Sequence, residues 1–279
     1  MKLGELLKKH NFKFSKKYGQ NFLSDGNLLE SIVVKGGVNE STPVLEIGCG
    51  AGTLTKVLCQ KAKYVYGYEI DKTLAPVLGD NLRGIENCDV TFKDIMREKT
   101  LEVENRIGEE YMLVANLPYY ITTPIIMKFI EQSQNCKAIV IMVQEEVALR
   151  ICAKAGTADY GAITASINLV ADSEIIQKVP RTMFMPAPNV DSAVVKIVFN
   201  RNKYPNADKK VYRDTVRCAF LSRRKTLTNN LREWLKISKE EAERLLLDCN
   251  VNVMARGETL TEEDFVTLSA LIKERFLKN

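Results

Sequence analysis

Residues 44–52 read VLEIGCGAG, a short apolar run that leads into three alternating glycines. The apolar run predicts a buried strand, and the segment TLTKVLCQKA that follows at 53–62 has the spacing of a helix. Glycines between a strand and a helix let the backbone pass close to a ligand and turn tightly into the helix. This stretch therefore predicts an α/β sheet with a ligand-binding loop at the end of a strand.

Strand-like and helical runs continue to alternate up to residue 200. We expect further strands at 64–70, 89–94, 111–117, 138–144, 174–179 and 192–199, and helices at 124–132, 145–155 and 161–171. Pro124 would lie in the first turn of its helix, where its missing N–H does no harm. The order of these runs predicts a Rossmann-like α/β fold, in which a parallel sheet gains late strands at one edge.

The pattern changes near residue 200, where NRNKYPNADK combines turn residues with charge. Beyond it we see helical spacing alone, at 208–221, 223–236, 239–249 and 261–277. We therefore expect two domains: an α/β domain at 1–200 that begins with a basic arm, and a small all-helical domain at 201–279.

Charge is distributed unevenly along the chain. The formal net charge of the whole sequence is +5, yet residues 1–24 and 201–279 each carry +5 while residues 25–200 carry −5. Solvated helix faces would explain this distribution, and so would a polyanion bound by both basic ends with the chemistry in the acidic middle.

Composition argues against several classes of protein. No stretch approaches the roughly 20 apolar residues that a membrane span needs, and the N-terminus lacks the apolar core of a signal peptide. Seven cysteines without a C-x-x-C pair are typical of reduced thiols, so we expect a cytoplasmic protein without a zinc site. His10 is the only histidine, which argues against histidine catalysis and against any metal centre built on histidines.

The spacing of the glycines distinguishes two nucleotide cofactors. The G-x-G-x-x-G fingerprint of NAD-binding proteins fails, because the position of its last glycine, counted from Gly48, is Thr53. A G-x-G-x-G run preceded by an acid, here Glu46, is instead typical of methyltransferases that use S-adenosylmethionine. We therefore expect Gly48 and Gly50 to bind S-adenosylmethionine, with NAD as the weaker alternative.

Acidic residues end the next two predicted strands. Glu69 is placed to accept hydrogen bonds from both ribose hydroxyls of the cofactor, and Asp94 to accept one from its adenine amino group. The neighbouring Asp71 is predicted to be the N-cap of the following helix. Because open α/β sheets bind ligands at the carboxyl ends of their strands, these acids should lie beside the glycine loop.

Residues 116–119 read Asn-Leu-Pro-Tyr and end the fourth predicted strand. The amino group of adenine is a poor nucleophile because its lone pair is delocalised into the ring. If the side-chain oxygen of Asn116 and a backbone carbonyl at Leu117 each accept one N–H, the lone pair is freed to attack a methyl group. Tyr119 can stack on the base, which is worth roughly 1–3 kcal/mol. An ordinary exit from a strand into a turn is the alternative.

At this point the sequence resembles the small-subunit ribosomal RNA adenine N6-dimethyltransferases over nearly its whole length. The resemblance rests on the segments 17–23, 46–55, 68–71, 116–122, 142–147, 184–193 and 220–231. It implies that Asn21 and Leu23 line the methionine side of the cofactor, that Asn116 also contacts the cofactor, and that Tyr119 and Phe184 sandwich the target adenine.

The same resemblance implies the substrate and the partner. The family methylates two adjacent adenosines, each twice, in a hairpin near the 3′ end of small-subunit rRNA, so the partner would be the small ribosomal subunit. We expect the chain to act as a monomer without a metal ion.

The cluster Arg223-Arg224-Lys225 begins the predicted helix at 223–236. Cations are mildly unfavourable at a helix N-terminus, so three of them there suggest an external anion such as an RNA phosphate. A solvated helix start is the alternative.

Three other functions remain open. A large-subunit rRNA dimethyltransferase of the macrolide-resistance type shares both sites, but its fourth-strand motif more often reads Asn-Ile-Pro-Tyr, and it lacks the pattern at 223–231. A non-enzymatic assembly factor would need neither the glycine loop nor the segment at 116–119. A DNA adenine methyltransferase shares the Asn-x-Pro-Tyr chemistry and is disfavoured only by the resemblance.

Overall fold

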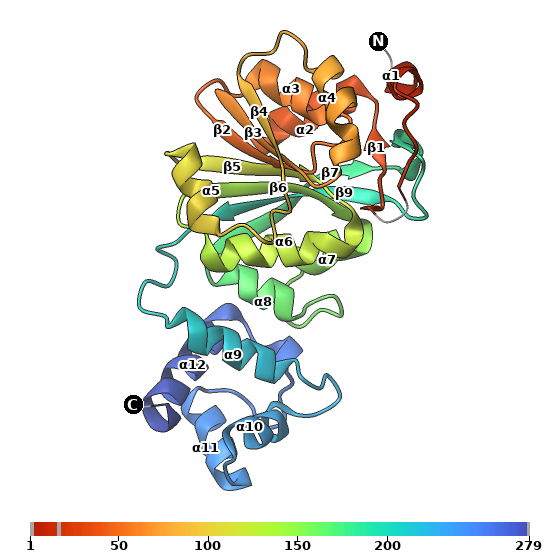
Figure 1. Ribbon diagram of the computed structural model, residues 1–279. Helices are drawn as coiled ribbons and strands as arrows, with labels where there is room; N and C mark the ends of the chain where they lie inside the picture. The colour runs from red at the N-terminus through yellow and green to blue at the C-terminus, as the bar shows by residue number, and fades with distance from the viewer. Residues whose placement is uncertain (1–2, 16–17, 278–279) are drawn as a thin grey trace. The chain divides into compact units, whose positions relative to one another are not determined.

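The computed structural model describes residues 3–15 and 18–277. A seven-stranded sheet forms the centre of the part of the chain that precedes residue 200 (Figure 1). Its strands follow the order β4-β3-β2-β5-β6-β9-β7. They are β2 (Pro43–Ile47), β3 (Tyr64–Glu69), β4 (Cys88–Phe92), β5 (Tyr111–Asn116), β6 (Cys136–Gln144), β7 (Ala171–Val179) and β9 (Ser192–Phe199). The pairs from β4 to β6 are parallel, whereas β9 is antiparallel to β6. The predicted Rossmann-like sheet with late strands at one edge is thus confirmed.

Helices cover both faces of this sheet. Figure 1 shows α2 (Gly26–Gly36), α3 (Thr53–Lys61) and α4 (Ala75–Asn81) on one face, and α5 (Thr100–Ile107) and α6 (Tyr119–Gln132) on the other. Apolar residues of α2 and α3 pack on the strands in the main core, where Leu58 and Val33 are fully buried. This burial on both faces explains why residues 138–143 of β6 read as an uninterrupted apolar run.

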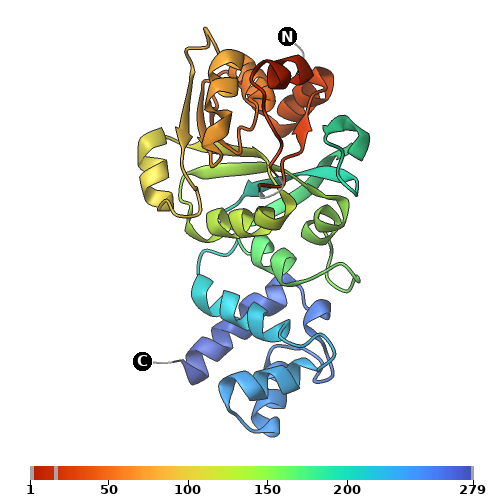
Figure 2. The same ribbon diagram turned by 45° about the vertical axis from the view of Figure 1, so that its right-hand side comes forward.

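The N-terminal segment packs on the α4 side of the sheet. In Figure 2 the red helix α1 (Leu3–Lys9) lies beside the orange helices of this face. Leu6 and Leu7 of α1 join a hydrophobic cluster with Val77 and Leu78. Further along, the two-residue strand β1 (Phe22–Leu23) pairs antiparallel with β8 (Phe184–Met185). Of the basic arm, Lys2, Lys16 and Lys17 lie outside the described residues.

One helix begins earlier than the sequence suggested. We predicted that Pro124 lies in the first turn, but α6 begins at Tyr119, directly after Pro118 at the N-cap. Pro124 therefore lies in the second turn, where its missing N–H removes a bond inside the helix. The prediction was wrong because only Leu117 and Pro118 separate the end of β5 at Asn116 from the start of the helix at Tyr119.

The chain divides into two compact units, residues 1–148 with 174–199 and residues 149–173 with 200–279. The second unit contains α8 (Ala162–Asn168), α9 (Lys209–Ala219), α10 (Leu227–Leu235), α11 (Lys239–Asp248) and α12 (Glu262–Phe276), and α7 (Glu145–Ile151) straddles the division. Ser238 and Thr261 form capping boxes that fix the starts of α11 and α12. No described residue beyond 200 lies in a strand, and in the described part of the chain no helix is long and apolar enough to cross a membrane.

The basic cluster at 223–225 lies before a helix and not within it. Helix α10 begins at Leu227 with Thr226 at the N-cap, whereas we had placed its start at Arg223. The backbone N–H of Lys225 donates to the Ser222 carbonyl at 3.1 Å, which closes a turn ahead of the helix. The predicted start was wrong because this turn uses the residues that would otherwise form the first helical turn.

Candidate active site

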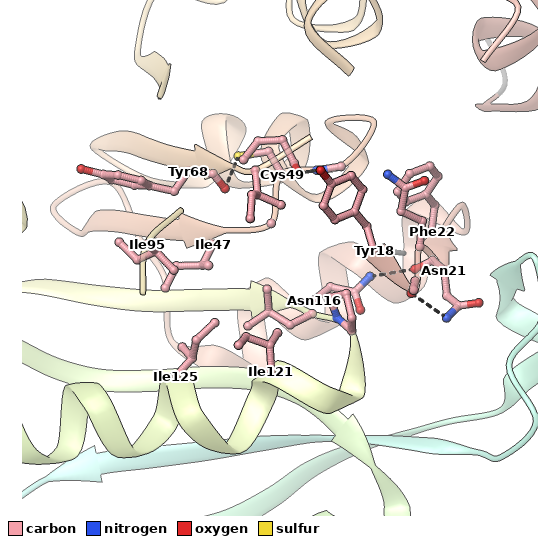
Figure 3. Close-up of a pocket in the computed structure, with 18 of the residues that line it drawn as sticks. Tyr18, Asn21, Phe22, Ile47, Cys49, Tyr68, Ile95, Asn116, Ile121 and Ile125 are labelled. Atoms are coloured by element: carbon pink, nitrogen blue, oxygen red, sulfur yellow. Dashed lines mark hydrogen bonds between the residues drawn. The ribbon is translucent and has the colours of Figure 1, made fainter. Parts of the chain in front are cut away.

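A cavity of about 280 Å³ opens at the carboxyl ends of the central parallel strands (Figure 3). Its size is near the lower end of the roughly 300–1,000 Å³ typical of ligand pockets. The predicted site residues that line it are Asn21, Gly48, Gly50, Glu69, Asp94, Asn116, Leu117, Tyr119 and Phe184. Leu23 does not line it: this side chain is 1% exposed and belongs to the hydrophobic core.

The glycine loop needs glycine for both backbone and packing reasons. Gly48 and Gly50 have φ values of +78° and +57°, in the left-handed region that other residues rarely adopt. A Cβ on Gly48 would lie 2.8 Å from Leu117 Cδ2, and one on Gly50 would lie 2.9 Å from Phe22 Cε1. The loop can therefore pass close to the Asn116–Tyr119 turn and to the N-terminal segment at the cavity wall.

Glu69 ties this loop to the neighbouring strand. Its Oε2 accepts the N–H of Gly50 at 2.8 Å, and its Oε1 accepts the N–H of Asp71 at 2.8 Å. Burial raises the pKa of this carboxyl, and the backbone N–H bonds oppose that rise. Because each carboxylate oxygen accepts more than one hydrogen bond, Glu69 retains acceptor capacity toward the cavity.

Asn116 is oriented by the N-terminal segment. At the end of β5 its Nδ2 lies 3.5 Å from the carbonyl of Asn21 and donates to it (Figure 3). Asn21 is in turn held by its own side chain, which donates to the Gly19 carbonyl at 3.1 Å. With its NH₂ group engaged in this way, Asn116 has its side-chain oxygen as the group that can accept a hydrogen bond from a ligand.

Two aromatic side chains line the same cavity from different elements. The hydroxyl of Tyr119, at the start of α6, lies 2.8 Å from Ser192 Oγ, and burial raises the pKa of the phenol. Phe184 in β8 is 7% exposed and also packs in the main core. Both rings are therefore fixed in position, Tyr119 by a hydrogen bond and Phe184 by packing.

Asp94 lies two residues beyond the end of β4, and not at the strand end as predicted. One of its carboxylate oxygens accepts the N–H of Met96 at 3.0 Å, and the other lies 3.4 Å from Nε of Arg97. These contacts fix the carboxylate within the lining of the cavity.

Sequence reasoning missed a contact made by one residue of the cavity wall, Gln20. Asp71 is the N-cap of a short 3₁₀ helix, as predicted, because its Oδ1 accepts the N–H of Thr73 at 3.0 Å. Its Oδ2, however, accepts a hydrogen bond from Nε2 of Gln20 at 2.7 Å. No local sequence signal could have revealed this bond, since its partners are 51 residues apart.

The three cations at 223–225 differ in their surroundings within the second unit. Arg223 donates to the carbonyls of Tyr160 at 2.7 Å and Ala158 at 3.3 Å. Lys225 forms an ion pair with Glu233. Arg224 is exposed and makes no hydrogen bond or ion pair with any residue that the structure describes. Of the three, Arg224 is the one whose charge is not already engaged within the protein.

Together the sheet, the glycine loop and the Asn116–Tyr119 turn define a Rossmann-like methyltransferase. The sequence pattern of the ribosomal RNA adenine dimethylase family matches residues 11–273, and the chain belongs to this family. It is 42% identical to the Ribosomal RNA small subunit methyltransferase A of Clostridioides difficile, over 97% of this chain and 95% of the relative. It is also 42% identical to the protein of that name from Geobacillus thermodenitrificans, over 98% and 95%.

Solved structures agree with this assignment. A dimethyladenosine transferase from Plasmodium falciparum superposes with a TM-score of 0.78 at 25% identity, over 91% of this chain and 98% of that one. The 23S rRNA methyltransferase ErmE superposes with a TM-score of 0.68 at 26% identity, over 92% and 100%. Both fold and family are therefore those of an rRNA-modifying enzyme.

Glu46 is a buried acid beneath the glycine loop. Its side chain is fully buried, and neither carboxylate oxygen has a hydrogen-bond partner among the described residues. Burial raises the pKa of Glu46 from its usual 4.5 to about 7, and the nearby Thr55 hydroxyl and Cys49 thiol limit that rise. Glu46 therefore resists ionisation in the folded protein.

Glu46→Gln should make folding less sensitive to pH. The raised pKa means that the folded wild-type protein binds this proton more tightly than the unfolded chain does. Its stability therefore falls as pH rises between about 4.5 and 7. The glutamine variant lacks this loss, so its free energy of unfolding should gain about 2–3 kcal/mol relative to wild type between pH 5 and pH 8.

Urea unfolding of both proteins at the two pH values measures this difference. If the free energy of unfolding changes equally with pH in wild type and variant, the pKa of Glu46 does not change on folding.

Proposed function

We propose that this protein transfers methyl groups from S-adenosylmethionine to N6 of two adjacent adenosines near the 3′ end of small-subunit (16S) rRNA. Each adenosine, in a hairpin of that rRNA, would receive two methyl groups, and the modification would contribute to maturation of the small subunit. Sequence identity favours small-subunit rRNA over large-subunit rRNA as the substrate. This chain is 42% identical to two small-subunit methyltransferases and 26% identical to the 23S rRNA methyltransferase ErmE.

The cavity walls fit S-adenosylmethionine. Glu69 is a buried carboxylate with acceptor capacity left for ribose hydroxyls, and Asp94 offers an acceptor for the adenine amino group. Gly48 and Gly50 keep the loop free of side chains, and Asn21 lines the cavity. When bound, S-adenosylmethionine supplies an electrophilic methyl group on its sulfonium.

The orientation of the Asn116 side chain supports this reaction most directly. Because its NH₂ group donates to the Asn21 carbonyl, its oxygen can accept one N–H of an adenine amino group. A second acceptor, proposed at the backbone carbonyl of Leu117, would take the other N–H. The nitrogen lone pair is then withdrawn from the ring and available for attack, an arrangement that stabilises the transition state more than the ground state.

The aromatic residues and the absence of a catalytic histidine fit the same chemistry. Tyr119 and Phe184 line the cavity and could hold the base between them, since each stacked ring contributes about 1–3 kcal/mol. The methylated amine is a strong acid at the moment of transfer, so water can remove its proton without a general base. A cavity that admits a monomethylated amine would allow the second transfer.

Methylation of ribosomal subunits tests the proposed function. The protein is incubated with S-adenosylmethionine and with small subunits from cells that lack the modification, and the rRNA is mapped by mass spectrometry. We expect dimethylation of two adjacent adenosines near the 3′ end and no product on large subunits or duplex DNA. Methylation of large-subunit rRNA, or of DNA alone, would contradict the proposal.

Asn116→Ala is the matched inactive control for this assay. The variant should fold and retain most of its affinity for S-adenosylmethionine, since it loses one polar group at the edge of the cofactor site. Its transfer rate should fall by roughly 10² to 10³-fold, the usual effect of removing one transition-state hydrogen bond. A transfer rate near that of wild type would contradict the role proposed for Asn116.

We also propose that Arg224 contacts RNA phosphate and that Arg223 does not. Arg224→Ala should weaken RNA binding and flatten its log–log salt dependence by about 0.7–0.9, the value for one lost phosphate contact. Arg223→Ala should leave that slope unchanged, because its guanidinium donates to the carbonyls of Tyr160 and Ala158. Affinities for small-subunit rRNA at several salt concentrations separate the two arginines, and equal slopes in all three proteins would refute the assignment.

A further inference from the structure

The segment Tyr18–Asn21, here termed the strap, forms part of the wall of the cavity. All four of its residues line the cavity, together with Phe22 that follows. The backbone carbonyl of Asn21 orients Asn116, so the strap touches the residue placed at the reacting amine. Its position therefore bears both on access to the cavity and on the geometry of Asn116.

The strap is firmly fixed at its C-terminal end. Leu23 of β1 pairs with Phe184 of β8, and Phe22 pairs with Met185. The Phe22 ring lies 6.1 Å from Phe12 and 5.6 Å from Phe14, between ring centroids, and it packs against the glycine loop at Gly50. Aromatic packing and strand pairing thus hold the chain on one side of the cavity.

Gln20 holds the middle of the strap through both ends of its side-chain amide. Its Oε1 accepts the backbone N–H of Ser15 at 2.8 Å, and its Nε2 donates to Asp71 Oδ2 at 2.7 Å. Asp71 is 4% exposed, and its backbone N–H donates to Glu69. One short chain of hydrogen bonds therefore links the strap to the carboxylate proposed to bind the ribose.

We propose that the Gln20–Asp71 hydrogen bond is a latch that keeps the strap closed over the cofactor and thereby sets the rate of cofactor release. The inference rests on the proposed function, since the cofactor in question is S-adenosylmethionine. A charged acceptor makes this bond stronger than an ordinary one, and the accepting residue Asp71 is buried, although the bond itself is only partly buried. Gln20 and Asp71 are positioning residues: they act through the strap and not on the reacting atoms.

The direction of this hydrogen bond can be tested, because donor and acceptor can be exchanged between the two residues by substitutions that keep the size of each side chain. Gln20→Glu places a second carboxylate against Asp71, and Asp71→Asn places an amide against the Gln20 amide. Either single change breaks the bond, while the acceptors for the N–H groups of Ser15 and Thr73 remain. The double variant combines both changes, so an asparagine amide can donate to a glutamate carboxylate and the bond is restored.

The first measurement is the dissociation rate of labelled S-adenosylmethionine from the full chain after a chase with unlabelled compound. We expect each single variant to release it about tenfold faster than wild type. The double variant should return to within about threefold of wild type. Gln60→Glu, the same charge change at an exposed position of α3, is the matched control and should release at the wild-type rate.

Amide hydrogen exchange in the cofactor-free protein is the second measurement. Peptides that cover the strap should exchange faster in both single variants and recover in the double variant. The proposed latch is contradicted if the single variants release the cofactor and exchange their amides as wild type does. It is also contradicted if the effects of the two single substitutions add up in the double variant. If the wild-type protein binds no S-adenosylmethionine, the proposed function fails, and the exchange data still decide whether the latch exists.

Discussion

The hydrogen bonds of the Glu69 carboxylate organise the site. A buried acid at the end of β3 accepts the N–H of Gly50 in the glycine loop and the N–H of Asp71 at the following turn. The bond from Gly50 joins the ends of β2 and β3, and the parallel pairing of those strands brings the loop and the acid together. Removing a buried carboxylate of this kind would leave two backbone donors without partners, at about 1–3 kcal/mol each.

The remaining parts of the site depend on this junction. Asp71 carries the link onward to Gln20, and the strap that Gln20 holds carries the carbonyl that orients Asn116. The proposed cofactor site and the proposed target-base site are therefore connected through the N-terminal segment as well as through the sheet. The proposed latch would thus couple closure over the cofactor to the position of Asn116.

Much of this site follows from the sequence because it depends on local patterns. Gly48, Glu69 and Asn116 were predicted together because each lies at the carboxyl end of a parallel strand, and the strands are recognisable from their apolar runs. The helix start at Tyr119 was missed because only two residues separate it from the end of β5. The start at Leu227 was missed because the turn that precedes it resembles a first helical turn in composition. The Gln20–Asp71 bond and the engagement of Arg223 depend on tertiary contacts, which no local pattern encodes.

Calorimetric titration of Glu69→Ala and of wild type with S-adenosylmethionine measures how much this carboxylate contributes to cofactor binding. Charged hydrogen bonds to ribose hydroxyls are worth about 1.5–3 kcal/mol each, so loss of two should weaken binding by at least about a hundredfold. Asp89→Ala, which removes an exposed carboxylate from the same sheet, should bind as wild type does. Unchanged affinity in Glu69→Ala would contradict the role proposed for Glu69, because the cofactor would then be held without the carboxylate around which the site is built.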